Sequence, residues 1–141
     1  MQRAVAGETC ASGRWRPAVL LIDPDASPTG ILARMLETAG ADLSLTPSVS
    51  AFLDDYPQRR LDLVLLDVDP ADRDVLRDVL SLRAFFGEGP ATRIVAIAPF
   101  AAPGIETLLL QAGCDGVAPL SDLARVAGAE IARLTGRSGA A

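Results

Sequence analysis

Apolar residues along the chain fall into short continuous runs that alternate with stretches of helical spacing. The clearest runs are residues 18–22, 61–66 and 93–98, which consist almost entirely of Ala, Val, Leu and Ile. Runs of this length, bounded by turn-forming residues, are typical of strands that are buried on both faces of a sheet. Two weaker strands are predicted at 42–45 and 116–118.

Apolar residues at helical spacing follow each predicted strand. After the first strand, Ser27 has the character of an N-cap and Pro28 suits the first helical position, and the pattern continues to Gly40. Four further helices are predicted at 48–56, 71–86, 103–112 and 121–134. Ser48 is the expected cap of the first of these, and Gly113 follows the third as a C-terminal glycine.

Strand followed by helix, five times over, predicts an α/β fold. Short links between alternating strands and helices require right-handed crossovers and a parallel sheet with helices on both faces. We expect a flavodoxin-like doubly wound five-stranded parallel sheet of order 2-1-3-4-5. The predicted domain spans residues 18–134, between a flexible leader at 1–17 and a flexible tail at 135–141.

Composition narrows the range of partners. The 141 residues suit one domain, and the formal net charge of −5 argues against a nucleic-acid surface, because phosphate binding needs clustered cations. No apolar run has the length of a membrane span, and no signal peptide is evident, so we expect a cytoplasmic protein. Cys10 and Cys114 lack metal-ligand spacing and are expected to be free thiols.

Two absences restrict the chemistry further. The chain has no His, and all 13 of its basic residues are Arg, so it also has no Lys. These absences remove the usual general base, the imidazole metal ligand and any amine nucleophile.

Carboxylates gather where the first and third predicted strands end. Asp23 and Asp25 follow the first strand, and Asp67 and Asp69 follow the third. In the expected strand order these ends share one crevice, where carboxylates raise one another's pKa unless a cation such as Mg²⁺ joins them. For Asp25 and Asp69 a plain turn-forming role is the stronger interpretation, whereas Asp67 ends the most apolar strand and is the candidate nucleophile.

Three segments give these carboxylates a family resemblance. Residues 20–23 (Leu-Leu-Ile-Asp), 63–67 (Leu-Val-Leu-Leu-Asp) and 111–116 (Gln-Ala-Gly-Cys-Asp-Gly) resemble motifs of response-regulator receiver domains of the CheY-like type. The resemblance implies that Asp67 is the phosphoacceptor. It also implies that Asp23, Asp67 and Asp69, with Asp25 as a further candidate, hold Mg²⁺.

Several positions depart from the pattern that the resemblance implies. Pro24 replaces the second acid after the first strand, and Pro70 follows Asp67 by three residues instead of four. Ala98 occupies the place of a Thr or Ser that binds the phosphoryl group. Ala118 occupies the place of a Lys that pairs with the phosphoacceptor and the phosphate. The predicted site therefore keeps a nucleophile and loses most of its electrophilic assistance.

The expected function is accordingly that of a stand-alone, divergent pseudo-receiver in two-component phosphorelay signalling. It would not be an enzyme, and it would act by docking to a histidine kinase, another regulator or a second copy, with impaired or absent phosphorylation of Asp67. The docking face that the resemblance implies comprises the predicted helix at 103–112, the predicted strand at 116–118 and the predicted helix at 121–134. Its apolar residues, each of which has inward packing as its commoner alternative, are Ile105, Leu108, Leu109, Leu120, Leu123 and Val126.

Two other classes of function stay open. A small-ligand-binding flavodoxin-like module is compatible with the fold, although no Gly-rich phosphate loop follows the first strand and no His is present to bind a cobalamin. A hydrolase with paired carboxylates is compatible with the residue types, but it would lack a neighbouring cation or other base.

Overall fold

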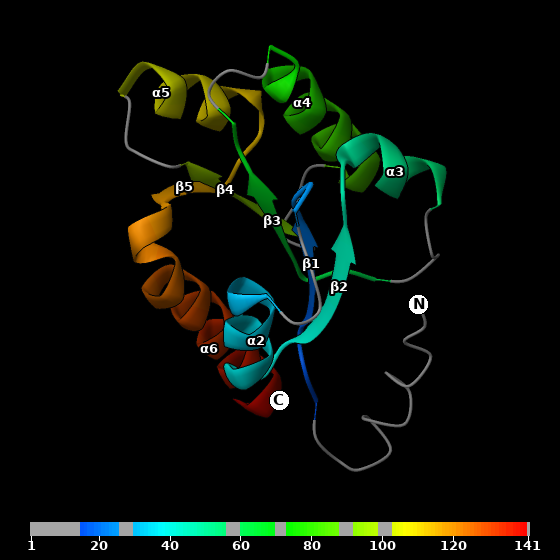
Figure 1. Ribbon diagram of the computed structural model, residues 1–141. Coiled ribbons are helices and arrows are strands. Elements are labelled where there is room, and N and C mark those ends of the chain that lie inside the picture. The colour runs from blue at the N-terminus through cyan, green and yellow to red at the C-terminus, as the bar shows by residue number, and fades with distance from the viewer. Residues whose placement is uncertain are drawn as a thin grey trace.

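Five strands and five helices alternate along the chain in the computed structural model, which describes residues 15–25, 30–55, 60–69, 73–87, 92–98 and 103–140 (Figure 1). The strands are β1 (Ala18–Ile22), β2 (Asp42–Thr46), β3 (Leu63–Asp67), β4 (Arg93–Ala98) and β5 (Gly116–Pro119). The helices are α2 (Ile31–Thr38), α3 (Val49–Asp54), α4 (Val75–Phe86), α5 (Pro103–Ala112) and α6 (Leu123–Ala140), with a 3-10 turn at Leu120–Asp122 before α6.

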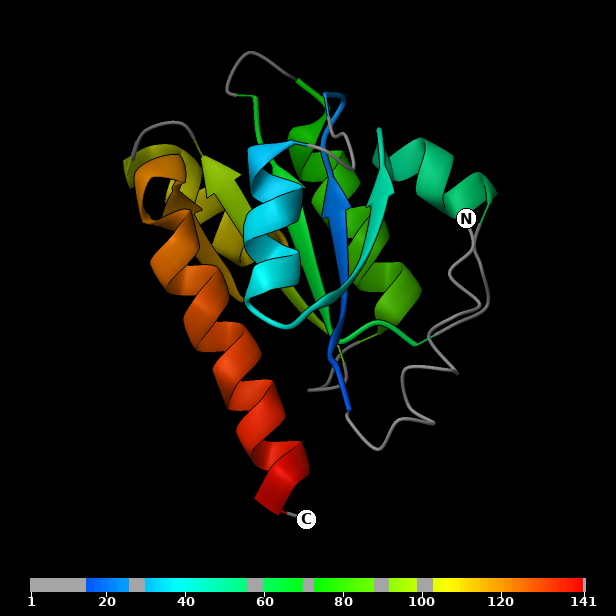
Figure 2. The ribbon, with the colours of Figure 1, turned by 60° about the horizontal axis from the view of Figure 1, so that its bottom comes forward.

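The strands form one parallel sheet of order β2-β1-β3-β4-β5, which confirms the predicted topology. Helices α3, α4 and α5 cover one face of this sheet, and α2 and α6 cover the other (Figures 1 and 2). The carboxyl ends of the strands therefore lie at a common edge, where β1 and β3 are direct neighbours. This edge positions the acidic residues of the candidate site.

Each strand contributes to two separate cores, because successive side chains of a strand point to opposite faces. In β3, Val64 and Leu66 pack under α3, α4 and α5, whereas Leu63 and Leu65 pack against α2 and α6. All four of these side chains are buried. Burial on both faces explains why the strands read as continuous apolar runs in the sequence.

Two helices begin later than predicted, and one begins at its predicted cap. Helix α2 begins at Ile31 with Gly30 as its N-cap, three residues after the predicted start; Ser27 and Pro28 lie outside the described residues. Ser48 caps α3 as predicted, with its Oγ accepting the Ala51 N–H at 3.0 Å. Helix α4 begins at Val75 instead of 71.

The two ends of the predicted domain also differ. Helix α6 continues to Ala140, whereas Leu134 is the last buried apolar residue among its described side chains, so the apolar pattern did not predict the helix beyond 134. At the other end, the Pro17 carbonyl accepts the Asp42 N–H at 2.8 Å, so β1 and β2 pair slightly before the predicted domain start. The rest of the predicted leader, residues 1–14, lies outside the described residues.

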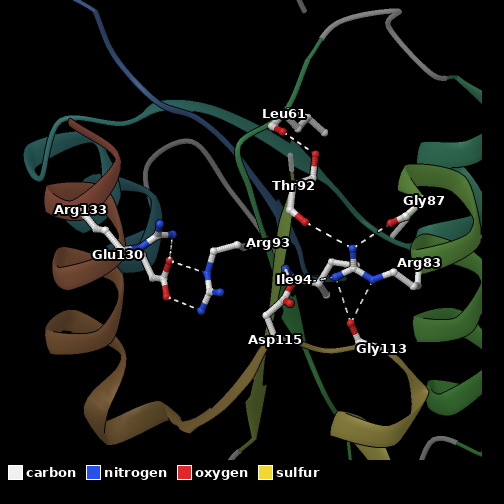
Figure 3. Close-up of polar contacts among 10 residues, drawn as sticks. All are labelled: Leu61, Arg83, Gly87, Thr92, Arg93, Ile94, Gly113, Asp115, Glu130 and Arg133. Carbon is white, nitrogen blue, oxygen red and sulfur yellow. Dashed lines mark hydrogen bonds and ion pairs between the residues drawn. The ribbon is translucent and has the colours of Figure 1, made fainter. Parts of the chain in front are cut away.

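Charged and polar side chains brace the amino-terminal edge of the sheet (Figure 3). Buried Asp62 accepts the Ala18 N–H at 2.9 Å, and the hydroxyl of buried Thr92 donates to the Leu61 carbonyl at 2.6 Å. These bonds connect β1, β3 and β4 at the edge opposite to the acidic residues. Every buried side-chain polar atom in the described part of the chain has a hydrogen-bond partner.

Two further sequence predictions concern the thiols and the membrane. Cys114 is a free, buried thiol as predicted, and burial raises its pKa to about 12; Cys10 lies outside the described residues. Among the helices of the described segments, none combines the length and the apolar character that a membrane span requires.

Candidate functional site

Asp67 is the last residue of β3, at the carboxyl edge of the sheet. It continues the row of Leu63 and Leu65, so strand alternation places its side chain on the face that α2 and α6 cover. The side chain is half-buried, and Ile97 of β4 is its partner in the register. The apolar run of β3 thus ends in one carboxylate at the boundary between core and solvent.

Asp23 and Asp25 lie in a turn directly after β1. The Asp23 N–H donates to the Thr46 carbonyl at 3.0 Å, which holds the end of β1 against β2. Asp23 Oδ1 accepts the Asp25 N–H at 2.9 Å, so its carboxylate closes an Asx-type turn around Pro24. The turn-forming role considered for these residues is therefore seen in the structure, and Pro24 occupies the middle of that turn.

The pKa of Asp67 shows that these carboxylates act on one another. Burial is the largest cause that raises this pKa, and the charges of Asp23, Asp25 and Asp69 raise it further. The structure thus brings all four predicted carboxylates into electrostatic range, with Asp69 exposed two residues after Asp67. Among the described residues, the charges that shift the pKa of Asp67 are all negative.

Carboxylates suit a hard divalent cation, but in this structure their side chains are not gathered around one point. Carboxylate oxygens are the ligands that Mg²⁺ prefers, and a cation would relieve the repulsion around Asp67. Within the described segments, however, no three acidic or cysteine side chains converge into a ready-made metal site. A bound cation would have to draw the side chains of Asp23, Asp25 or Asp69 toward Asp67.

The sheet register places Ala98 and Ala118, the predicted switch positions, on the two strands that follow β3 across the sheet. Asp67 pairs with Ile97, and Ile97 pairs with Ala118, so these three residues form one row across β3, β4 and β5. Ala98 follows Ile97 at the end of β4 and pairs with Pro119. Ala98 and Ala118 are each 3% exposed. The two predicted switch positions therefore hold buried methyl groups, which supply neither a hydroxyl nor a cation.

The expected docking face is only partly exposed. Leu109 and Leu123 are 0% exposed, so both pack into the core, which is the commoner alternative considered for each residue of this face, and neither can belong to a docking surface. Leu108 and Leu120 are 46% and 49% exposed and remain available. Ile105 and Val126 are half-buried and pack against the two core clusters.

Leu110 is an exposed residue that the sequence prediction missed. It is 43% exposed on α5, beside the buried Leu109. Three consecutive leucines, Leu108 to Leu110, cannot all face inward, because successive residues of a helix are about 100° apart around its axis. That triplet was the signal in the sequence for an exposed apolar flank on each side of Leu109.

Comparison by sequence alone finds no match, either to a protein-family model or to a curated protein. Comparison of folds finds clear likeness. A CheY-like receiver domain protein from Methanospirillum hungatei JF-1 superposes with a TM-score of 0.69 at 15% identity, covering 87% of this chain and 96% of that one. HP1043, an orphan response regulator of H. pylori, gives a TM-score of 0.64 at 20% identity, covering 88% and 98%.

A third solved structure of similar fold contains a modified residue and bound groups. A response regulator from Burkholderia pseudomallei, with a phosphorylated aspartic acid, a calcium ion and citrate, gives a TM-score of 0.67 at 18% identity, covering 88% of this chain and 71% of that one. The likenesses agree with the strand order of the sheet. The chain therefore has the CheY-like fold of response-regulator receiver domains.

Proposed function

We propose that this chain is a divergent receiver of two-component signalling that acts in the cytoplasm by docking to a protein, with little or no phosphorylation of Asp67. One observation supports this most directly: Asp67 is surrounded by negative charge, while buried methyl groups occupy the neighbouring switch positions Ala98 and Ala118. A phosphoryl group on Asp67 would add charge to a site where none of the described residues that shift the pKa of Asp67 is a cation.

The stability that a phosphorylated state would lose can be estimated from the two missing contacts. A Lys contact to a phosphoryl oxygen contributes about 1.5–3 kcal/mol, and a neutral hydroxyl contributes about 1 kcal/mol. Their loss lowers the stability of a phosphorylated state by about 2.5–4 kcal/mol, which is roughly a hundredfold or more in population. Phosphorylation would therefore bias a two-state switch only weakly, and a constitutive docking surface is the simpler output.

Solved structures of the same fold include both behaviours. One is described as an atypical orphan response regulator with a phosphorylation-independent regulatory mechanism, and it superposes with a TM-score of 0.64 at 18% identity. The Burkholderia protein carries a phosphorylated aspartic acid. The alanines at positions 98 and 118 favour phosphorylation-independent regulation for this chain. Mg²⁺ would be held by Asp67 with Asp23, Asp69 or Asp25, at low affinity because the ligands are not preassembled.

Nuclear magnetic resonance with a phosphoryl analogue tests the proposal. In the wild-type chain, adding beryllofluoride should leave the amide resonances of Asp67, Ala98 and Ala118 where Mg²⁺ alone places them. The double variant Ala98→Thr with Ala118→Lys restores the hydroxyl and the cation, and it should show shifts at these amides. Large shifts in the wild type at millimolar Mg²⁺ would establish a working phospho-switch and overturn the proposal.

Docking is tested separately against a cognate histidine kinase, another regulator or a second copy of the chain. Asp67→Asn should leave the dissociation constant unchanged, whereas Leu108→Ser with Leu120→Ser should weaken binding at least tenfold. Leu80→Ser is the matched control, because Leu80 is similarly exposed at 55% but lies on α4, outside the proposed face. Loss of binding in Asp67→Asn with normal binding in the leucine variants would contradict the proposal.

A further inference from the structure

Helix α2 buries one side against the sheet and leaves the opposite side open to solvent. Ala33 and Leu36 are its buried side chains, and each is 1% exposed. Ile31, on the other side, is 82% exposed, the highest value among the large apolar side chains that the structure describes. Figure 2 shows α2 as an outer helix that lies beside α6. Within one copy of the chain, Ile31 therefore gains almost none of the stabilisation that burial of an Ile provides.

Three more residues continue this open side along the helix. Ile31, Arg34, Met35 and Thr38, hereafter the α2 stripe, have the i, i+3, i+4, i+7 spacing of one helix face. Arg34 and Thr38 are exposed and Met35 is half-buried. The same four residues line an open hollow of about 420 Å³. The α2 stripe thus has the spacing and the free space of a helix face that packs against a second helix.

Two opposite charges beside the stripe lack partners. Arg34 and Glu37 are both exposed, and within the part of the chain that the structure describes neither side chain forms a hydrogen bond or an ion pair. Other Arg–acid pairs at the same spacing do form ion pairs, and in each of them the acid precedes the Arg: Asp74–Arg77, Asp122–Arg125 and Glu130–Arg133. In α2 the Arg comes first, which is the less favourable order within a helix.

A second copy of α2, packed antiparallel across a two-fold axis, supplies both missing partners. If the axis crosses α2 midway between Arg34 and Glu37, the Arg34 of each copy lies level with the Glu37 of the other. The two residues lie about 60° and 120° from Ile31 in the same direction around the helix axis, so both reciprocal pairs form on one side of the interface. The two copies of Met35 then meet at the axis. Charge and shape are therefore self-complementary along α2.

We propose that this chain associates with a second copy of itself through the α2 stripe, with the Arg34 of each copy paired to the Glu37 of the other. This interface is separate from the docking face of Leu108 and Leu120, and it depends neither on that face nor on Asp67. A helix of eight residues is about 12 Å long, so the interface is small and the dimer is weak and dependent on concentration.

Sedimentation equilibrium of the full chain tests the association. The wild type should show a monomer–dimer equilibrium at concentrations up to about 1 mM. Ile31→Glu places a charge in the contact, and it should raise the dissociation constant about tenfold or more. Leu80→Glu is the matched control, because Leu80 is 55% exposed on α4, and it should leave the dissociation constant unchanged. Circular dichroism should show that both variants are folded, since both side chains are exposed.

Charge reversal tests whether the occupant is a second copy. Arg34→Glu and Glu37→Arg each turn two attractive contacts into two repulsive ones, so each should weaken the association about fivefold or more. The double variant Arg34→Glu with Glu37→Arg restores opposite charges across the axis, and it should recover the dissociation constant of the wild type. A different partner would keep its own charges, so only a self-complementary interface predicts this recovery.

The dimer and the proposed function fail in different ways. A chain that stays monomeric at about 1 mM, or a double variant that associates no better than the single ones, would overturn the dimer. Loss of binding to a kinase or another regulator in Ile31→Glu, without any dimer in the wild type, would assign α2 to that partner and also overturn it. Dimers that persist in Ile31→Glu and are lost in Leu108→Ser with Leu120→Ser would support the proposed docking face and overturn the α2 interface.

Discussion

Gly113 is the residue at which backbone conformation and side-chain packing most clearly restrict the sequence. Gly113→Ala would place a Cβ in the left-handed region at φ +133° and within 2.9 Å of Arg83 Cβ. Strain of this kind costs about 1–3 kcal/mol, and displacement of Arg83 from its carbonyl partners adds to that cost. We therefore expect Gly113→Ala to lower the free energy of unfolding by about 2 kcal/mol or more, measured by urea denaturation.

Gly128 provides the control for that measurement. It lies within α6, and a Cβ there would meet no atom within 4 Å. Gly128→Ala should raise the free energy of unfolding by up to about 1 kcal/mol, because Ala is the better helix former. If the two variants changed stability in the same direction, the argument from the backbone conformation of Gly113 and its closeness to Arg83 would be wrong.

Asp67 gives stability a dependence on pH that one substitution can isolate. Burial and the charges of three other carboxylates raise its pKa above the ordinary value of 3.8. The folded state therefore binds this proton more tightly than the unfolded state. Ionised Asp67 consequently destabilises the fold fully above its raised pKa and not at all below the unfolded value. Asp67→Asn should raise the unfolding midpoint at pH 7 and leave it unchanged near pH 3.

Thermal unfolding of both proteins across this pH range measures the effect. Asp54→Asn on exposed α3 is a charge-matched control that should change the midpoint little. Saturating Mg²⁺ should reduce the advantage of Asp67→Asn, because a bound cation stabilises the ionised carboxylate. An Asp67→Asn variant that is less stable than the wild type at pH 7 would contradict the electrostatic description of the site.

At the scale of the elements, an ion pair joins α6 to β4. Its effect on stability depends on pH in the opposite sense to that of Asp67. Glu130 of α6 accepts two bonds from Arg93 of β4, both at 2.9 Å, and one from Arg133 at 2.8 Å. Burial alone would raise the pKa of Glu130, but the hydrogen bonds and charges of both arginines outweigh it, and the pKa is lowered. Glu130 therefore stabilises the fold above its unfolded pKa of 4.5, and this stabilisation is lost as pH falls through the folded value.

Glu130→Gln should lower the free energy of unfolding by about 1–2 kcal/mol at pH 7, because Arg93 is partly exposed and solvent screens part of the interaction. The difference from the wild type should shrink below pH 4.5. Chemical denaturation at pH 7 and near pH 3 measures both values. The surface pair of Asp122 and Arg125 is the control, and Asp122→Asn should cost less than about 0.5 kcal/mol. Equal losses in both variants would contradict the special role of Glu130.

The strands were the elements that the sequence predicted best, for a physical reason. Burial on both faces makes a strand such as β4 uniformly apolar, and the predicted span of β4 matches the observed Arg93–Ala98. Helix starts were predicted less well. Ser27 has the chemistry of an N-cap, yet α2 begins after Gly30, because the position of a cap depends on where the first turn meets the sheet.

At the scale of the whole molecule, topology made the carboxylate cluster predictable. Once the order 2-1-3-4-5 is inferred, the acids after β1 and β3 must share one edge, and the charges that act on Asp67 confirm this proximity. The contacts that Arg83 of α4 makes could not be predicted in this way. Its partners are mostly main-chain carbonyls, such as that of Gly113, which leave no trace in residue identity. Exposure of Leu108 and burial of Leu109 likewise depended on the rotation of α5 about its axis.

Because every central strand contributes to both cores, the two faces of the molecule should unfold together. Leu82 of α4 packs in one core and Leu123 of α6 in the other, and both are 0% exposed. Truncating either to Ala leaves a cavity that costs about 2–5 kcal/mol. We expect both Leu82→Ala and Leu123→Ala to keep a single cooperative transition and an unchanged dependence on urea.

Two probes follow this transition. The chain has one Trp, and Trp15 lies just before β1, so its fluorescence reports on the edge of the sheet, while far-ultraviolet circular dichroism reports on the helices of both faces. The two transitions should coincide in the wild type and in each variant. Leu80→Ala, at a side chain 55% exposed on α4, is the control and should cost less than about 1 kcal/mol. A variant in which the two probes separate would show that one helical layer detaches while the other stays folded, and the shared sheet would then not couple the two faces.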